Sequence, residues 1–158
     1  MLPVLTLGGN QVGKAAICDW KDVLAPALRS GKPISLWPFD GALPDLLMPG
    51  TIVVAETYPA ECYGCFCEEE VSSKGDRNEM KKFGALLIPW AEAHEIKLGN
   101  CLAEETQAGF PQGDDAFDAV VGLFGMLQVC LGQRPTGEPN EAVIHEIEGW
   151  ILGPGVGT

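Results

Sequence analysis

The sequence predicts one α/β domain over residues 1–158, in which helices flank a mixed or mostly parallel sheet. Three observations support this fold class. Strand-like runs alternate with helical patterns along the chain, which is typical of parallel α/β sheets. Residues 51–56 form a continuous, largely β-branched run, as expected for a strand buried on both faces. Residues 114 to about 131 combine an acidic start with an apolar body, as expected for a buried helix.

The amino-terminal elements are predicted from short apolar runs and turn signals. A short strand is expected over residues 3–7. Apolar residues then recur at helical spacing over about 11–29, which predicts an amphipathic helix. Residues 34–39 favour a second strand, and Asp40-Gly41 is a turn signal directly after it.

The middle of the chain predicts a helix with a defined start. Pro59, soon after the 51–56 run, suits the first turn of a short helix. Asp76 is followed three residues later by Glu79, a spacing typical of a helix cap. The residues that then recur at helical spacing predict a buried face: Met80, Phe83, Leu87, Trp90 and His94. Pro89 is expected to kink or interrupt this helix.

The carboxy-terminal part predicts a loop and two further helices. Residues 109–113 form the loop, because they begin and end with glycine. The acidic helix follows it, and a final helix spans roughly 139–148.

Composition narrows the classes of function. The chain has 22 acidic and 10 basic residues and a formal net charge of −12, which argues against a broad nucleic-acid surface. The basic cluster within residues 74–82 is expected to be a solvated face. No apolar run approaches the roughly 20 residues that span a bilayer, and no signal peptide is recognisable at residues 1–9. We therefore expect a soluble cytoplasmic protein with no membrane partner.

The six cysteines are expected to be free thiols, because no secretory signal is recognisable. Cys62, Cys65 and Cys67 form one cluster, and a Cys-x-x-Cys pair can bind zinc. A structural zinc site needs four ligands, however, and no second Cys-x-x-Cys or His pair occurs. Small buried side chains or partly exposed thiols are the favoured interpretation.

A glycine-rich segment, Gly8–Lys14, fits the pattern G-x-x-x-x-G-K of a phosphate-binding loop. Ala15 stands where that motif has the Ser or Thr that helps to hold Mg²⁺. The alternative interpretation is a turn at Gly8 and Gly9 followed by a helix that Asn10 caps. Nucleotide binding through Gly8–Lys14 is kept as an alternative function.

Carboxylates provide the strongest candidate site. Asp114, Asp115 and Asp118 lie in the first turn and a half of the acidic helix, where positions 114 and 118, or 115 and 118, share a face. Glu56 ends the 51–56 strand, at the sheet edge where α/β proteins bind ligands. Such acids could hold one or two Mg²⁺ or Mn²⁺ ions for phosphodiester hydrolysis, although helix caps and ion pairs also use them.

A family resemblance rests on segments that occur in order over nearly the whole chain. They are 7–16 (Leu-Gly-Gly-Asn-Gln-Val-Gly-Lys-Ala-Ala), 37–41 (Trp-Pro-Phe-Asp-Gly), 55–61 (Ala-Glu-Thr-Tyr-Pro-Ala-Glu), 115–119 (Asp-Ala-Phe-Asp-Ala) and 148–153 (Glu-Gly-Trp-Ile-Leu-Gly). Through them the chain resembles the predicted nucleases called domain of unknown function 429. The resemblance implies an RNase H-like fold and a nucleic-acid substrate. It also implies that Glu56 and Asp115 or Asp118 are counterparts of the metal-binding acids of RNase H-like enzymes.

The chain departs from the RNase H-like pattern at its start. Those enzymes carry their first catalytic Asp on an opening strand within an amino-terminal hairpin sheet, and this chain resembles the part that follows it. No Asp precedes Asp19, which is expected inside a helix, and Asp40 is the nearest spare carboxylate. We therefore expect either a metal-dependent nuclease or its inactive remnant. A half-sheet would also leave an edge exposed, so a non-catalytic module that forms a homodimer is the alternative.

Overall fold

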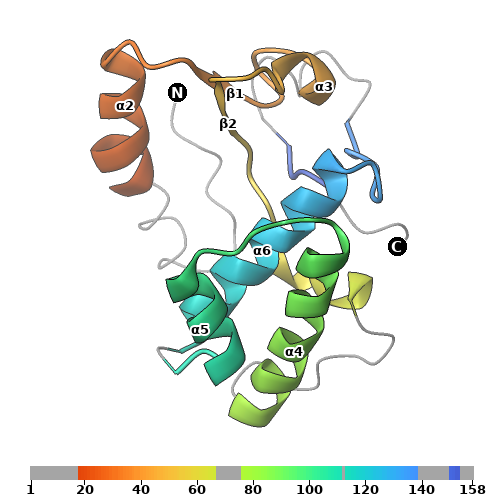
Figure 1. Ribbon diagram of the computed structural model, residues 1–158. Coiled ribbons are helices and arrows are strands. Elements are labelled where there is room, and N and C mark those ends of the chain that lie inside the picture. Colours follow the sequence, from red (N-terminus) through yellow and green to blue (C-terminus); the bar gives the residue numbers. More distant parts are fainter. Residues whose placement is uncertain (1–17, 67–75, 112, 139–149, 154–158) are drawn as a thin grey trace. The chain divides into compact units, whose positions relative to one another are not determined.

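The computed structural model describes residues 18–66, 76–111, 113–138 and 150–153 (Figure 1). The chain divides into two compact units, which are described one at a time. Unit 1 comprises residues 1–56 and 138–150, and unit 2 comprises residues 57–137 and 151–158. Helices together with a small parallel sheet make the fold mixed α/β, which confirms the predicted class at this level.

Some sequence predictions lie outside the described residues. They concern the strand over 3–7, the segment Gly8–Lys14, the beginning of the helix at 11–29 and the final helix at 139–148. None of the helices that the structure does describe is long and apolar enough to cross a membrane.

The described part of unit 1 begins with a helical segment, which confirms residues 19–29 of the helix predicted over about 11–29. A π-helical stretch, η1 (Asp19–Leu24), continues into the α-helix α2 (Ala25–Arg29). No residue of these two segments is buried, and Val23 is 61% exposed. The amphipathic character expected for this helix stays a prediction, because exposure alone does not show how its apolar residues are arranged around η1 and α2.

The sheet of unit 1 contains two parallel strands among the described residues. Strand β1 (Ile34–Leu36) pairs with β2 (Ile52–Val54), with Ser35 opposite Val53. The parallel arrangement confirms the prediction, but both strands are shorter than expected. Ile52 is 53% exposed, so the prediction of a strand buried on both faces is wrong here. A β-branched run indicates a strand, but it does not show which neighbours cover that strand.

The connection between the strands starts with the predicted turn and continues into the short helix α3 (Leu43–Leu46). The backbone N–H of Asp40 donates to the carbonyl of Leu36 at 2.9 Å. The Asp40 carboxylate in turn accepts a hydrogen bond from the Leu36 N–H at 2.7 Å. Asp40 therefore closes the turn, as aspartates in turns commonly do.

Unit 2 is helical in its described part. The 3₁₀ segment η2 (Pro59–Cys65) has its proline in the first turn, as predicted. It is followed along the chain by α4 (Arg77–Ala93), α5 (Asn100–Ala108) and α6 (Asp114–Cys130). Sequence reasoning did not identify α5, whose residues are mostly polar or small.

Helix α4 shows how well the apolar spacing predicts a core. The Asp76 carboxylate accepts a hydrogen bond from the Asn78 N–H at 2.8 Å, which confirms the predicted cap. Met80, Phe83 and Leu87 are buried as expected, while Trp90 and His94 are half-buried. The helix continues through Pro89, so the prediction that it would be interrupted there is wrong. Leu87 and Ala91, buried on either side, hold both turns in the core although one backbone donor is missing.

The core of unit 2 joins α4 and α6 to η2 and to the loop before α6. Its buried residues are Cys62, Met80, Phe83, Leu87, Ala91, Phe110, Phe117, Val120, Val121 and Phe124. Glycines allow the closest approaches between elements. Gly84 of α4 lies against the Thr106 carbonyl of α5, where a Cβ would come within 2.5 Å of the oxygen. Gly125 of α6 lies against Cys62 of η2.

Candidate functional site

The candidate site of unit 2 is built on the first turns of α6. Gly113 occupies the N-cap position with φ +113°, and no side chain caps the helix there. Asp114 and Asp115 are exposed in the first turn, and Asp118 is half-buried one turn later. The two exposed carboxylates complement the positive end of the helix dipole, which the sequence could suggest. The environment of Asp118 is different.

Asp118 accepts a hydrogen bond from a tyrosine that sequence reasoning missed. The Tyr63 hydroxyl of η2 donates to Asp118 Oδ1 at 2.6 Å. The Tyr63 ring is stacked on Phe117 with a centroid distance of 5.7 Å, and it meets Phe83 edge-on at 5.8 Å. These aromatic contacts fix the position of the donor, so Asp118 is oriented by a rigid partner rather than by solvent.

The electrostatics of the site follow from this contact. Burial raises the pKa of Tyr63 above its ordinary value, and the hydrogen bond to Asp118 raises it further. The negative charges of Asp118 and Asp114 act on the Tyr63 pKa in the same direction. Tyr63 therefore remains a protonated donor over the physiological pH range. The effect of Asp114 indicates that the i, i+4 pair of Asp114 and Asp118 acts on the Tyr63 side of α6.

The metal site expected from the sequence stays a prediction. Glu56 is exposed at the end of unit 1, whereas Asp114, Asp115 and Asp118 belong to unit 2. Within the described ranges of either unit, no three His, Cys, Asp or Glu side chains form a group that could hold a metal ion. The structure brings Asp118 into contact with Tyr63, and Asp114 lies one helical turn before it on α6.

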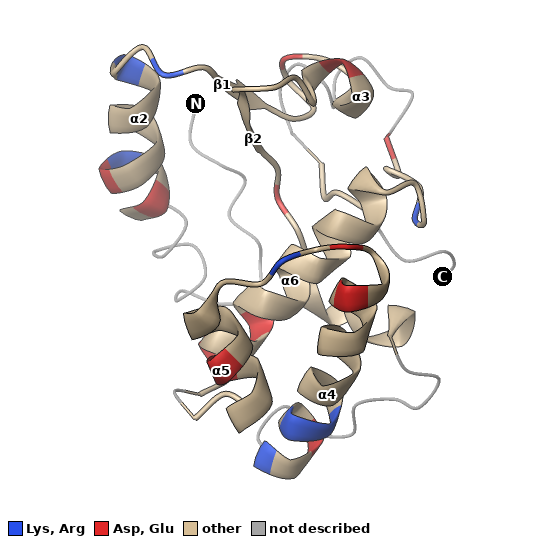
Figure 2. Ribbon diagram, viewed as in Figure 1, with Lys and Arg blue, Asp and Glu red and all other residues tan. Residues whose placement is uncertain are grey.

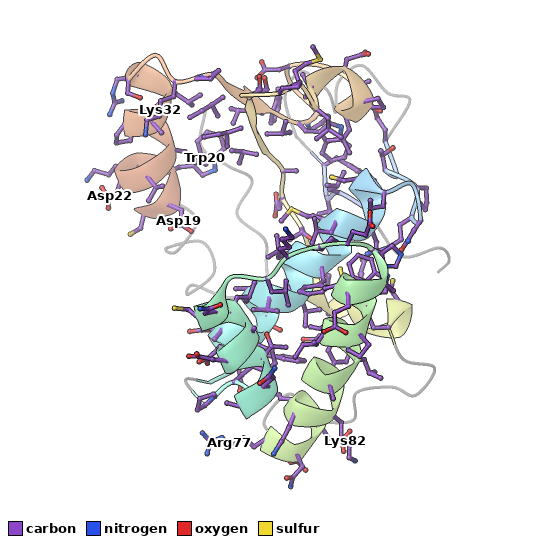
Figure 3. All side chains as sticks on the ribbon, in the orientation of Figure 1. Asp19, Trp20, Asp22, Lys32, Arg77 and Lys82 are labelled. Carbon is purple, nitrogen blue, oxygen red and sulfur yellow. The ribbon has the colours of Figure 1, made fainter. Side chains whose placement is uncertain are left out.

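The basic residues at the start of α4 make local contacts. Lys82 donates to Glu79 of the preceding turn at 2.6 Å, and Arg77 donates to the Pro111 carbonyl at 3.3 Å. Basic residues are blue at this end of α4 in Figure 2, and Figure 3 labels Arg77 and Lys82. The ion pair joins residues three apart on one helix face, which is the common arrangement of a solvated surface.

Comparisons of the chain with protein-family models, with curated proteins and with solved structures found no match. The likeness to RNase H-like nucleases stays a prediction, as does nucleotide binding through Gly8–Lys14.

Proposed function

We propose that the chain is a metal-dependent RNase H-like nuclease that binds Mg²⁺ or Mn²⁺ at the first turns of α6. The observation that supports this most is the hydrogen bond between Tyr63 and Asp118. Carboxylates that bind metal ions are commonly held by a hydrogen bond from a second group, which fixes the orientation of the oxygens. Tyr63 supplies such a bond from a side chain packed between aromatic rings.

The donor set suits a hard divalent cation. Mg²⁺ is usually bound through one or two carboxylates, several waters and the phosphates of a substrate. Asp114 and Asp118 provide two carboxylates one helical turn apart, and Asp115 is exposed beside them. The family resemblance implies Glu56, which belongs to unit 1, as a further metal-binding acid.

The acidity of the chain is consistent with this use of a metal. A net charge of −12 repels a phosphate polymer, and a divalent cation bound by two carboxylates neutralises their charge and can take a phosphate oxygen as a further ligand. When bound, such an ion activates water and stabilises the leaving oxygen in phosphodiester hydrolysis. In this proposal Asp114 and Asp118 bind the cation, and Tyr63 keeps Asp118 in its orientation.

Cleavage of fluorescent RNA, DNA and RNA–DNA hybrid strands tests the proposal. We expect cleavage that requires Mn²⁺ or Mg²⁺ and is lost in Asp114→Asn and in Asp118→Asn. Asp45→Asn and Glu104→Gln are matched controls, because both remove one exposed charge elsewhere, and they should retain full activity. Cleavage that survives both Asp114→Asn and Asp118→Asn would contradict the assignment. Metal binding without any cleavage would support the metal site but would contradict the proposed nuclease activity.

A second candidate function, a module that pairs with a second copy of the chain, is favoured by the surface of unit 1. Val23, Met48 and Ile52 are 61%, 60% and 53% exposed. Two-stranded sheets are marginal alone, and among the described residues β1 and β2 each have one unpaired edge. We propose that the unpaired strand edges of this sheet pair two copies of the chain.

Sedimentation velocity over a concentration series tests the pairing. We expect a concentration-dependent dimer for the natural chain and a monomer for Ile52→Lys. Leu86→Lys is the matched control, since it places the same charge on an exposed apolar residue of unit 2 and should leave the dimer intact. A natural chain that stays monomeric at every concentration would refute the homodimer.

A further inference from the structure

Segment η2 carries two thiols on one face. Cys62 and Cys65 are three residues apart in a 3₁₀ helix, where side chains at this spacing eclipse each other. Each thiol contacts the carbonyl four residues earlier, at 3.7 Å for Cys62 and 3.8 Å for Cys65. A 3₁₀ helix rises about 2 Å per residue, so the two α-carbons are roughly 6 Å apart, and the eclipsed Cβ atoms are about as far apart. A disulfide needs Cβ atoms about 4 Å apart, so its formation requires a local adjustment of η2.

The two thiols differ in their access to solvent. Cys62 is 1% exposed and belongs to the core, where Gly125 of α6 makes room for its sulfur. Cys65 is exposed on the same segment. A reagent from solution therefore reaches Cys65 directly, whereas the core covers Cys62.

A cation is positioned on the buried thiol. Arg134 Nη1 donates to Cys62 Sγ at 3.2 Å, and Nη2 of the same guanidinium donates to the Gly153 carbonyl. Two anchoring contacts hold the positive charge beside the sulfur. A nearby guanidinium favours the thiolate form of a cysteine, which is the form that attacks disulfides and leaves from them.

Burial and the charge of Arg134 change the pKa of the exposed Cys65 thiol in opposite directions. Burial raises the pKa of Cys65, and the charge of Arg134 lowers the pKa only in part, so the pKa lies above its ordinary value. The charge of Cys62 also raises the Cys65 pKa. Both thiols therefore lie within the electrostatic reach of one arginine, which agrees with the helical spacing that places them on one face.

We propose that Cys62 and Cys65 form a redox-active dithiol that exchanges with small-molecule disulfides of the glutathione type. The Cys65 thiolate attacks one sulfur of the external disulfide, which forms a mixed disulfide and releases one external thiolate. The Cys62 thiolate then attacks Cys65 Sγ, which forms the Cys62–Cys65 disulfide and releases the second external thiolate. The dithiol loses two electrons and two protons, and the external disulfide takes them up as two thiols.

Arg134 assists in both directions of this exchange. Its Nη1 contacts Cys62 Sγ, the sulfur that makes the second attack. In the reverse reaction an external thiolate attacks the exposed Cys65 Sγ, and Cys62 leaves as a thiolate next to the guanidinium. The reaction needs no metal, so it is independent of the nuclease proposal.

Mapping of the disulfide tests the proposal directly. The reduced full chain is incubated with oxidised glutathione, quenched with an alkylating reagent and analysed by peptide mass spectrometry. We expect an intramolecular Cys62–Cys65 disulfide in the natural chain and none in Cys65→Ser. Cys62→Ser should accumulate glutathione on Cys65, because the second attack is lost. Cys67→Ser and Cys130→Ser are controls that should keep the disulfide.

A second measurement, the rate of the second exchange step, tests the contribution of the Arg134 charge. We expect Arg134→Gln to slow the second step roughly threefold to tenfold, whereas Arg134→Lys keeps most of the rate because it keeps the charge. Urea unfolding confirms that each variant is folded before its rate is compared. A natural chain without a Cys62–Cys65 disulfide, or one that pairs Cys65 with Cys67, would overturn the proposal. Because both results come from the natural chain, they hold even if Cys62→Ser fails to fold.

Discussion

The hydrogen bond between Tyr63 and Asp118 joins two side chains that are 55 residues apart in the sequence. Sequence reasoning identified Asp118 from its place in the acidic helix. It could not identify Tyr63, because η2 carries no signal that points to α6. The stacking of Tyr63 on Phe117, next to Asp118, arises only when η2 packs against α6. Site residues within one helix are thus readable from spacing, and a partner from another element is not.

We expect that removal of the Tyr63 hydroxyl weakens both the fold and the binding of Mn²⁺. Tyr63→Phe keeps the ring in its stack but deprives Asp118 of this donor. We expect a loss of about 1 kcal/mol in the free energy of unfolding, measured with urea, because Asp118 is only half-buried. The affinity for Mn²⁺ should fall about tenfold, as for other groups that orient a ligand.

The other tyrosine of the chain provides the control. Tyr58 is 54% exposed, so Tyr58→Phe should change neither the urea midpoint nor the Mn²⁺ affinity. If Tyr63→Phe behaves like Tyr58→Phe in both measurements, the hydrogen bond does not orient Asp118 in solution.

At the scale of elements, the contact between η2 and α6 depends on a glycine. Gly125 lies against Cys62, and a Cβ at this position would overlap Sγ and approach Cys62 Cβ to 3.1 Å. We therefore expect Gly125→Ala to destabilise the chain by about 1 to 3 kcal/mol in urea unfolding. In an open helix the same change would stabilise, since alanine is the better helix former.

Gly64 serves as the matched control because it has open space around its Cα on η2. Gly64→Ala should change the free energy of unfolding by no more than about 0.5 kcal/mol. A Gly125→Ala variant as stable as Gly64→Ala would mean that η2 does not pack closely on α6.

The elements that were predicted correctly are those with strong local signals. The apolar spacing of α4 and its Asp76 cap, the body of α6 and the Asp40 turn all follow from residues close together in the chain. Helix α5 has weak periodicity and was missed. The burial of β2 was also misjudged, because exposure depends on neighbours that the run itself does not specify.

At the scale of the whole molecule, the net charge of −12 affects every experiment with cations. An acidic chain attracts divalent ions weakly over its whole surface, and salt screens this attraction over about 10 Å at 0.1 M. A specific site is distinguished by binding that persists in salt and depends on particular carboxylates. A control variant must therefore remove the same charge elsewhere.

The most direct test of the account is a calorimetric titration with Mn²⁺ in moderate salt. It compares the natural chain with Asp114→Asn/Asp118→Asn and with the matched control Asp19→Asn/Asp22→Asn. Asp19 and Asp22 are exposed in η1, as Figure 3 shows, so the control removes two charges from a different helical segment. We predict one binding event that the control keeps and Asp114→Asn/Asp118→Asn loses. Equal weakening in both variants, or no binding by the natural chain, would contradict a metal site at α6.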